Sequence, residues 1–250
     1  LCQGKSDFDH IEPFRKDDVF PICMQVNQVP SSPTLRQRLD AAAACETANW
    51  NSILLEESAA LLKKIHAPLT GFTVGERCCI PLDIDVSPFD NSGTKKEGVK
   101  RTYQGTDGFA PIFAYLGREG YGINVQLREG SVHCQKETDH FLDESIHYAR
   151  QITDQKLLVR MDAGNDSFDN LRVLHQHPDT DYIIKVNLRG ASKECWLHLA
   201  ETNGIACEQR DGKIETIGAI EFAEKGFDSK LRQVFRVIKR TIDRHGQILL

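Results

Sequence analysis

Apolar and polar residues alternate in short runs through the middle of the chain, and this pattern predicts strands. Residues 79–86 alternate apolar side chains with carboxylates, as in a strand with one buried face. Residues 109–116 and 122–127 form two more runs, and the glycines between them predict an antiparallel hairpin. Residues 156–161 and 182–186 are short apolar runs that suit buried strands. The middle of the chain is therefore expected to build a sheet.

Helical spacing of apolar residues occurs before and between these strands. In the first third it runs from Leu35 to Ala43 and again from Leu54 to Leu62, and residues 31–34 (Ser-Ser-Pro-Thr) supply N-cap candidates. Further helices are expected over 138–153 and 167–176. After a short helix near 191–203 come strand candidates punctuated by glycine, the last of them at 233–243 and 246–250.

The order of these elements predicts the fold class. Three antiparallel strands, a helix, a strand, a helix and a strand form the element order of an RNase H-like sheet, an α/β fold with flanking helices. We expect a helical N-terminal region over 1–75, the first part of the core over 76–190, and the start of a β-rich insertion over 191–250. The chain begins without Met and stops inside the apolar run 248–250, so we expect it to be incomplete at both ends.

Composition narrows the class of protein. With 40% hydrophobic and 27% charged residues in 250, the chain has the composition of a globular protein, and it contains no apolar run of membrane-spanning length. A net charge of −5 is unusual for a protein that handles DNA. Basic residues nevertheless cluster at Lys95, Lys96, Lys100 and Arg101, where they can hold phosphates or form a solvated surface.

Two carboxylates lie in the first predicted strand of the core. Side chains alternate along a strand, so Asp83 and Asp85 share one face while Leu82 and Ile84 occupy the other. Two acids on one face of an apolar strand are costly to bury unless a cation or donors neutralise them. The alternative is an edge strand with a solvated acidic face.

A third aspartate ends another predicted strand. The apolar run 157–161 leads to Asp162, and Gly164 permits a tight turn after it. Ligands gather at strand ends in α/β folds. Alternatively, Asp162 starts a turn or caps the next helix, a role that Asp166 or Ser167 fills as well. Oxygen ligands from two strands, without His or Cys beside them, suit magnesium or manganese.

Four sequence blocks resemble the group-1 DDE transposases of bacterial insertion sequences, in the order found in that family. They are residues 82–93 (LDIDVSPFDNSG), 103–111 (YQGTDGFAP), 127–130 (LREG) and 158–164 (LVRMDAG). In that family the first Asp is typically followed by x-Thr or x-Ser. Asp85-Val86-Ser87 matches this pattern better than Asp83, so Asp85 is the expected first metal ligand and Asp83 a neighbouring carboxylate. Asp162 matches the second Asp.

The resemblance implies an RNase H-like catalytic core that binds two Mg²⁺ ions, with Mn²⁺ as a substitute. Such enzymes cut double-stranded DNA at the ends of the element and join it to target DNA as a dimer in a synaptic complex. It also implies a bacterial cytoplasmic protein associated with the nucleoid and not with a membrane. Lys95, Lys96, Lys100 and Arg101 are the expected DNA contacts.

The third acid of the family, a Glu on a helix beyond the insertion, has no convincing match before Leu250. We therefore expect it further along a longer protein, and expect this fragment alone to be inactive. Two other functions fit the same residues: a DNA-binding or dimerisation module without catalysis, and a metal-dependent nuclease on a similar sheet.

Overall fold

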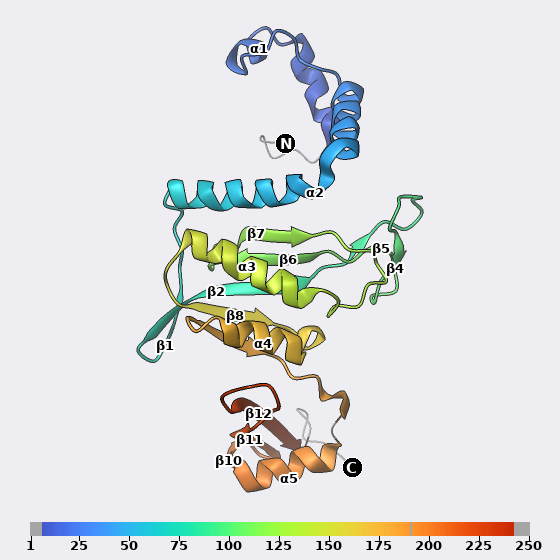
Figure 1. Cartoon of the computed structure of the whole chain (residues 1–250). Coiled ribbons are helices and arrows are strands. Elements are labelled where there is room, and N and C mark those ends of the chain that lie inside the picture. The colour runs from blue at the N-terminus through green and yellow to red at the C-terminus, as the bar shows by residue number, and fades with distance from the viewer. Residues whose placement is uncertain (1–6, 191, 243–250) are drawn as a thin grey trace. The chain divides into compact units, whose positions relative to one another are not determined.

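The computed structural model describes residues 7–190 and 192–242. The chain divides into two compact units, Leu1–Leu61 and Leu62–Leu250 (Figure 1). A long helix, α2 (Ser32–Lys64), begins in the first unit and ends in the second. No helix in the described ranges is both long and apolar enough to cross a membrane.

The first unit is helical. It contains a 3-10 helix, η1 (Phe8–Lys16), the short helix α1 (Phe20–Cys23) and most of α2. Ser31 caps α2, because its Oγ accepts a hydrogen bond from Thr34 N at 3.3 Å. The predicted cap is therefore confirmed, and the two predicted helical segments are parts of one helix.

A mixed sheet forms the centre of the second unit. Its strands follow the order β7-β6-β2-β8-β9, and β1 pairs with the start of β2. Their bounds are β1 Phe72–Val74, β2 Arg77–Val86, β6 Ile112–Leu116, β7 Tyr121–Gln126, β8 Leu157–Met161 and β9 Thr180–Ile184. Strands β6 and β7 run antiparallel to their neighbours, whereas β8 and β9 run parallel to β2. This mixed α/β architecture confirms the predicted fold class.

Strand β2 is central, with β6 on one side and β8 on the other. The alternative of an acidic edge strand is therefore wrong. Leu82 is 0% exposed and Ile84 is 2% exposed, and both belong to the core face. Helices α3 (Thr138–Ile152) and α4 (Phe168–Gln176) pack against each other beside the sheet (Figure 1). The alternation predicted for β2 is thus observed, and its carboxylates lie on the face opposite the apolar core.

A small second sheet lies between β2 and β6 in the sequence. It has the strand order β3-β5-β4, formed by β3 (Phe89–Asp90), β5 (Asp107–Phe109) and β4 (Lys100–Arg101). The strands are two or three residues long, which is too short for an alternating pattern to predict them.

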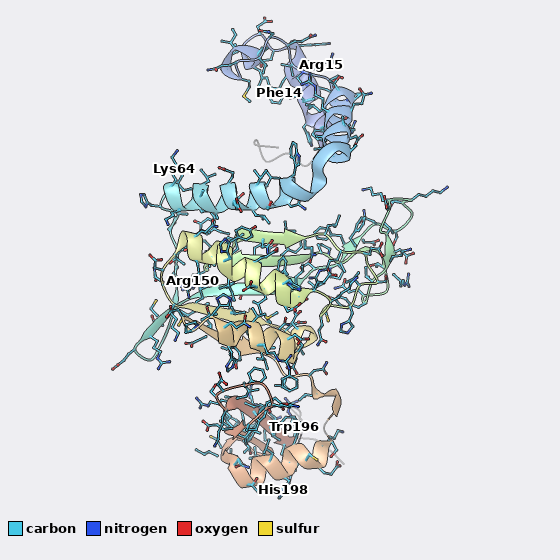
Figure 2. The ribbon with its side chains drawn as sticks, viewed as in Figure 1. Phe14, Arg15, Lys64, Arg150, Trp196 and His198 are labelled. Carbon is cyan, nitrogen blue, oxygen red and sulfur yellow. The ribbon has the colours of Figure 1, made fainter. Side chains whose placement is uncertain are left out.

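The C-terminal part of the second unit is an antiparallel sheet with one helix. Helix α5 (Lys193–Asn203) carries Trp196 and His198 (Figure 2) and is followed by β10 (Gly204–Arg210), β11 (Lys213–Phe222) and β12 (Leu231–Arg240). Phe235 is buried over Gly218, where a Cβ would lie 2.3 Å from Cζ of its ring. The strand candidate at 246–250 lies outside the described residues.

Candidate active site

Asp85 and Asp162 are neighbours at the ends of two parallel strands. In the register of β2 and β8, Asp83 pairs with Arg160 and Ile84 with Met161. The next residues along the two strands are therefore Asp85 and Asp162. Both side chains are exposed. The carboxyl ends of parallel strands form the edge at which α/β proteins bind ligands, so both predicted acids lie where chemistry is expected.

The Asp85 carboxyl is influenced by burial and by neighbouring charges. Partial burial raises the pKa of Asp85 above its ordinary value, and the negative charges of Asp162 and Asp83 raise it further. A hydrogen bond from Val86 N to Asp85 Oδ1, 2.9 Å long, acts in the opposite direction. A cation bound between these acids would relieve the repulsion.

Asp162 is held in a fixed orientation by the turn that follows it. Its Oδ1 accepts hydrogen bonds from Gly164 N at 3.0 Å and from Asn165 Nδ2 at 2.8 Å, so Asp162 caps the 3-10 helix η2 (Ala163–Asn165). Ser167 caps α4 instead, by accepting from Asn170 N at 3.3 Å. Asp162 thus begins a turn and caps η2, but it does not cap α4. Its carboxylate still has acceptor capacity for a ligand.

Asp83 has a different environment from Asp85. Arg160 donates from Nε to Oδ1 and from Nη2 to Oδ2, each at 2.5 Å. The Arg160 guanidinium also lies over the Phe72 ring, with Cζ 5.0 Å from its centroid. Both Asp83 oxygens therefore have a cationic partner, and Asp85 and Asp162 are the acids with capacity left for a cation.

Comparison with known proteins identifies the family. The profile of the family described as Transposase DDE domain group 1 matches residues 1–245, nearly the whole chain. The chain belongs to this family of DDE transposases. Among curated proteins, none matches significantly. Among solved structures, a piggyBac transposase in a synaptic complex with hairpin DNA matches at 14% identity and a TM-score of 0.34, with 96% of this chain covered. The match covers 52% of that transposase, about half its length.

DDE transposases generally depend on divalent metal ions, and the two exposed aspartates of this chain suit such ions. Both offer hard oxygen donors, which magnesium and manganese prefer over nitrogen or sulfur. Within residues 7–190 and 192–242, no three His, Cys, Asp or Glu side chains gather as a metal-holding group. Asp85 and Asp162 are thus a pair in this part of the transposase. The position of a third acid stays a prediction.

The predicted DNA contacts lie on β4 of the small sheet and in the loop before it. Lys95, Lys96, Lys100 and Arg101 are all exposed. Arg101 Nη1 forms an ion pair with Asp107 Oδ1 at 3.2 Å, but the three lysines have no such pair with any residue in the described ranges. This sheet starts at Phe89, shortly after Asp85, so the chain leads directly from the acidic site to the lysines.

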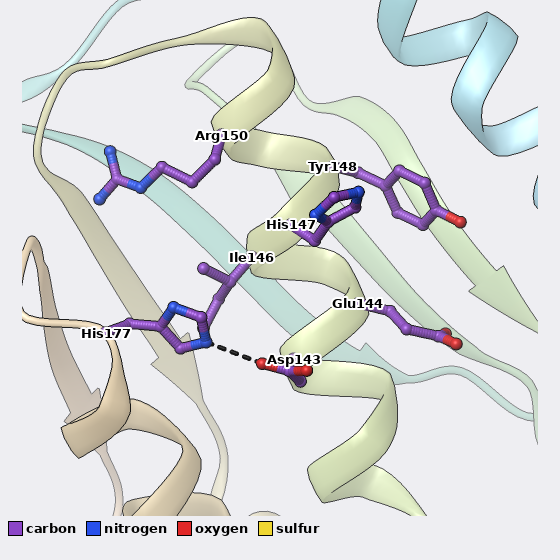
Figure 3. Close-up of a pocket in the computed structure, with 7 residues that line it drawn as sticks. All are labelled: Asp143, Glu144, Ile146, His147, Tyr148, Arg150 and His177. Carbon is purple, nitrogen blue, oxygen red and sulfur yellow. Dashed lines mark hydrogen bonds and ion pairs between the residues drawn. The ribbon is translucent and has the colours of Figure 1, made fainter.

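A surface pocket elsewhere in the transposase does not contain these residues. It is lined by Asp143 and His147 of α3 and by His177, whose Nε2 lies 2.8 Å from Asp143 Oδ1 (Figure 3). His177 follows the end of α4, whereas Asp162 precedes its start. The pocket is therefore separate from the acidic strand ends.

Arg128 forms no ion pair with an acidic side chain of the described residues. It is 6% exposed and donates to Gln126 Oε1, to the carbonyl oxygen of Cys134 and to Thr138 Oγ1. Asn165 was not predicted as a site residue. It is fully buried, and its side-chain amide donates a hydrogen bond to Asp162. Its position three residues after Asp162 was the available signal, since short polar side chains at that spacing often bond back to a turn.

Proposed function

We propose that Asp85 and Asp162 hold Mg²⁺, with Mn²⁺ as a substitute, for phosphodiester hydrolysis and DNA strand transfer at insertion-sequence ends. The observation that carries the proposal is the juxtaposition of two exposed carboxylates at the ends of adjacent parallel strands, β2 and β8. The family membership supports the same chemistry.

The roles of the residues follow from their positions. A pair of divalent ions supplies charge neutralisation for the attacking and leaving oxygens of a phosphodiester. Asp85 binds and orients one side of that site from β2. Asp162 does so from β8, with its carboxylate fixed by Gly164 and Asn165. Arg160 keeps Asp83 beside the site, where its charge adds to the negative potential that attracts cations.

The partner in this proposal is double-stranded DNA, both the ends of the mobile element and the target. Lys95, Lys96 and Lys100 are available to neutralise phosphates, and Arg101 contributes a charge shared with Asp107. A homodimer in a synaptic complex within the bacterial cytoplasm is part of the proposal. So is a core that spans 76–190 between a helical region and an insertion.

Metal binding by the whole chain tests the proposal directly. Calorimetric titration with MnCl₂, repeated on Asp85→Asn and Asp162→Asn, measures binding without the need for a DNA substrate. Each substitution is expected to abolish the binding seen in the unsubstituted chain, because each removes half of the donor pair. Asp154→Asn is the matched control, since Asp154 is an exposed acid in the loop before β8.

The outcomes separate the possible functions. Loss of binding in both site variants but not in Asp154→Asn supports the metal centre. Binding that is indifferent to both site variants, or no binding by the unsubstituted chain, contradicts it. In that case, salt-dependent DNA binding that persists in the variants would identify a DNA-binding module instead.

A further inference from the structure

Arg128 is a buried cation at the same edge of the sheet as the two acids. Ile112 begins β6 and pairs both with Val86 at the end of β2 and with Gln126 at the end of β7. Arg128 follows Gln126 by two residues, and its carbonyl oxygen accepts from Ala110 N at 3.0 Å. Arg128 is 6% exposed, so its guanidinium is removed from water. A buried charge is costly unless it is hydrogen-bonded or paired.

The hydrogen bonds of Arg128 fix the segment between β7 and α3. Its Nε donates to Gln126 Oε1 at 2.9 Å. Its Nη1 donates to the carbonyl oxygen of Cys134 and to Thr138 Oγ1, each at 3.2 Å. No acidic side chain in the described ranges forms an ion pair with it, and its Nη2 is buried without a hydrogen-bond partner there. The guanidinium therefore donates to neutral acceptors at the end of β7, in the loop after it and at the first residue of α3.

The same loop is hydrogen-bonded to the turn that follows Asp162. Cys134 Sγ donates to the carbonyl oxygen of Gly164 at 2.9 Å. The next residue, Gln135, donates from Nε2 to the carbonyl oxygen of Asp166, also at 2.9 Å. These two contacts flank the residue whose backbone N and side-chain amide both bond to Asp162, namely Asn165. A continuous path of contacts therefore runs from Arg128 to the Asp162 carboxylate.

We propose that Arg128 is a positioning residue for Asp162. Its hydrogen bonds to Cys134 and Thr138 hold the loop in place. That loop in turn is hydrogen-bonded to the turn after Asp162, at Gly164 and Asp166. The inference rests on the proposed function, because it assigns importance to the orientation of Asp162 as a metal ligand. The planar guanidinium of Arg presents donors on three nitrogens and can bond acceptors that are set apart, whereas all the donors of Lys lie on one nitrogen.

Hydrogen exchange of two backbone amides tests the path in the full chain. Gly164 N donates to Asp162 Oδ1, and Asn165 N donates to the Asp162 carbonyl oxygen at 3.2 Å. In Arg128→Lys we expect both amides to exchange roughly tenfold faster, because the turn opens locally. The amide of Val159 in β8 should keep its rate, since the ladder of the strand does not depend on the loop.

A second pair of variants keeps the test decisive where Arg128→Lys folds poorly. Cys134→Ala removes the donor to Gly164, whereas Cys134→Ser retains one. We expect faster exchange at Gly164 and Asn165 in Cys134→Ala and near-normal rates in Cys134→Ser. Unchanged rates at both amides in Arg128→Lys and Cys134→Ala would overturn the proposal. An equal increase at Val159 would overturn it too, because it would indicate general destabilisation.

Mn²⁺ binding separates this inference from the proposed function. Arg128→Lys should bind Mn²⁺ several-fold more weakly than the unsubstituted chain, since a looser turn orients Asp162 less well. If the unsubstituted chain binds no Mn²⁺, the metal centre is wrong, and the exchange rates still decide whether Arg128 holds the turn. If Mn²⁺ binds equally to both chains, the metal centre stands and the positioning role is wrong.

Discussion

Arg160 reaches across from β8 to hold both oxygens of Asp83 on β2, with Nε–Oδ1 and Nη2–Oδ2 distances of 2.5 Å. The two residues are register partners in adjacent parallel strands. This pair distinguishes the two aspartates of β2, which share a face. Asp83 is paired with a cation of the protein, whereas Asp85 is left for an external cation.

The first prediction concerns this ion pair. Because the side chains of Arg160 and Asp83 are 41% and 37% exposed, solvent screens the pair, and we expect a coupling energy of about 1 kcal/mol. Urea unfolding of Asp83→Asn, Arg160→Met and the double variant measures it. Asp83→Asn should keep Mn²⁺ binding, unlike Asp85→Asn. Abolished binding at unchanged stability would make Asp83 a direct ligand instead.

The second prediction concerns the cost of ionising Asp85. Its pKa in the folded chain is raised, so folding favours the protonated form. The loss of folding free energy from ionised Asp85 is absent below the unfolded pKa near 3.8, and it is fully present once the pH exceeds the folded pKa. Asp85→Asn should therefore stabilise the metal-free chain at pH 7, by up to about 1 kcal/mol after screening. Thermal melts at pH 7 with chelator measure this, and lower stability of the variant would contradict it.

The third prediction concerns Gly164, which lies in the turn after Asp162. A Cβ there would lie 3.0 Å from Cys134 Sγ and 3.2 Å from Asp162 Oδ1. Gly164→Ala should therefore destabilise the chain by about 1–3 kcal/mol and weaken Mn²⁺ binding. Gly190→Ala is the control, because a Cβ at Gly190 meets nothing within 4 Å. Equal melting temperatures and Mn²⁺ affinities for the two variants would contradict the prediction, because they would show that the turn accommodates a Cβ at residue 164 without strain.

Local patterns predicted the central strand and its acidic face, because alternation within residues 79–86 is enough to separate Asp83 and Asp85 from Leu82 and Ile84. The partner of Asp83 was not predictable in the same way. Arg160 lies 77 residues away in sequence, and only the register of two parallel strands brings them together. The resemblance indicated Asp85 and Asp162, and the register explains why they are neighbours.

Strand boundaries also could not be predicted from the local pattern of apolar and polar residues. The last core strand was expected at 182–186 and is observed as Thr180–Ile184. Thr180 is polar yet buried, and its N donates to the His177 carbonyl oxygen. Its place in the strand therefore depends on tertiary contacts that hydrophobicity does not report. The buried position of Arg128 has the same origin.

The fourth prediction concerns the acid sensitivity of the C-terminal sheet. Arg236 on β12 holds Glu215 on β11 through Nε–Oε1 at 2.6 Å, and this lowers the pKa of Glu215 below its ordinary 4.5. The pair stabilises the fold above the unfolded pKa, and this contribution is lost as the pH falls through the folded pKa. The protection of β11 amides from hydrogen exchange, measured relative to the intrinsic rate at each pH, should therefore fall in acid, and less so in Glu215→Gln. Identical acid profiles for the two chains would show that the pair contributes nothing.

The fifth prediction concerns Lys100 on β4 and Lys95 and Lys96 in the loop before it. Each phosphate contact adds about 0.9 to the slope of log affinity against log salt. Replacement of Lys95, Lys96 and Lys100 by Ala should therefore weaken binding to a DNA duplex and lower the slope by up to about 3. Fluorescence anisotropy at several salt concentrations measures both. Three exposed lysines elsewhere provide a control with the same charge change: Lys63, Lys64 and Lys193. If the two triple variants bind alike, the effect is one of net charge, and the DNA contacts another surface.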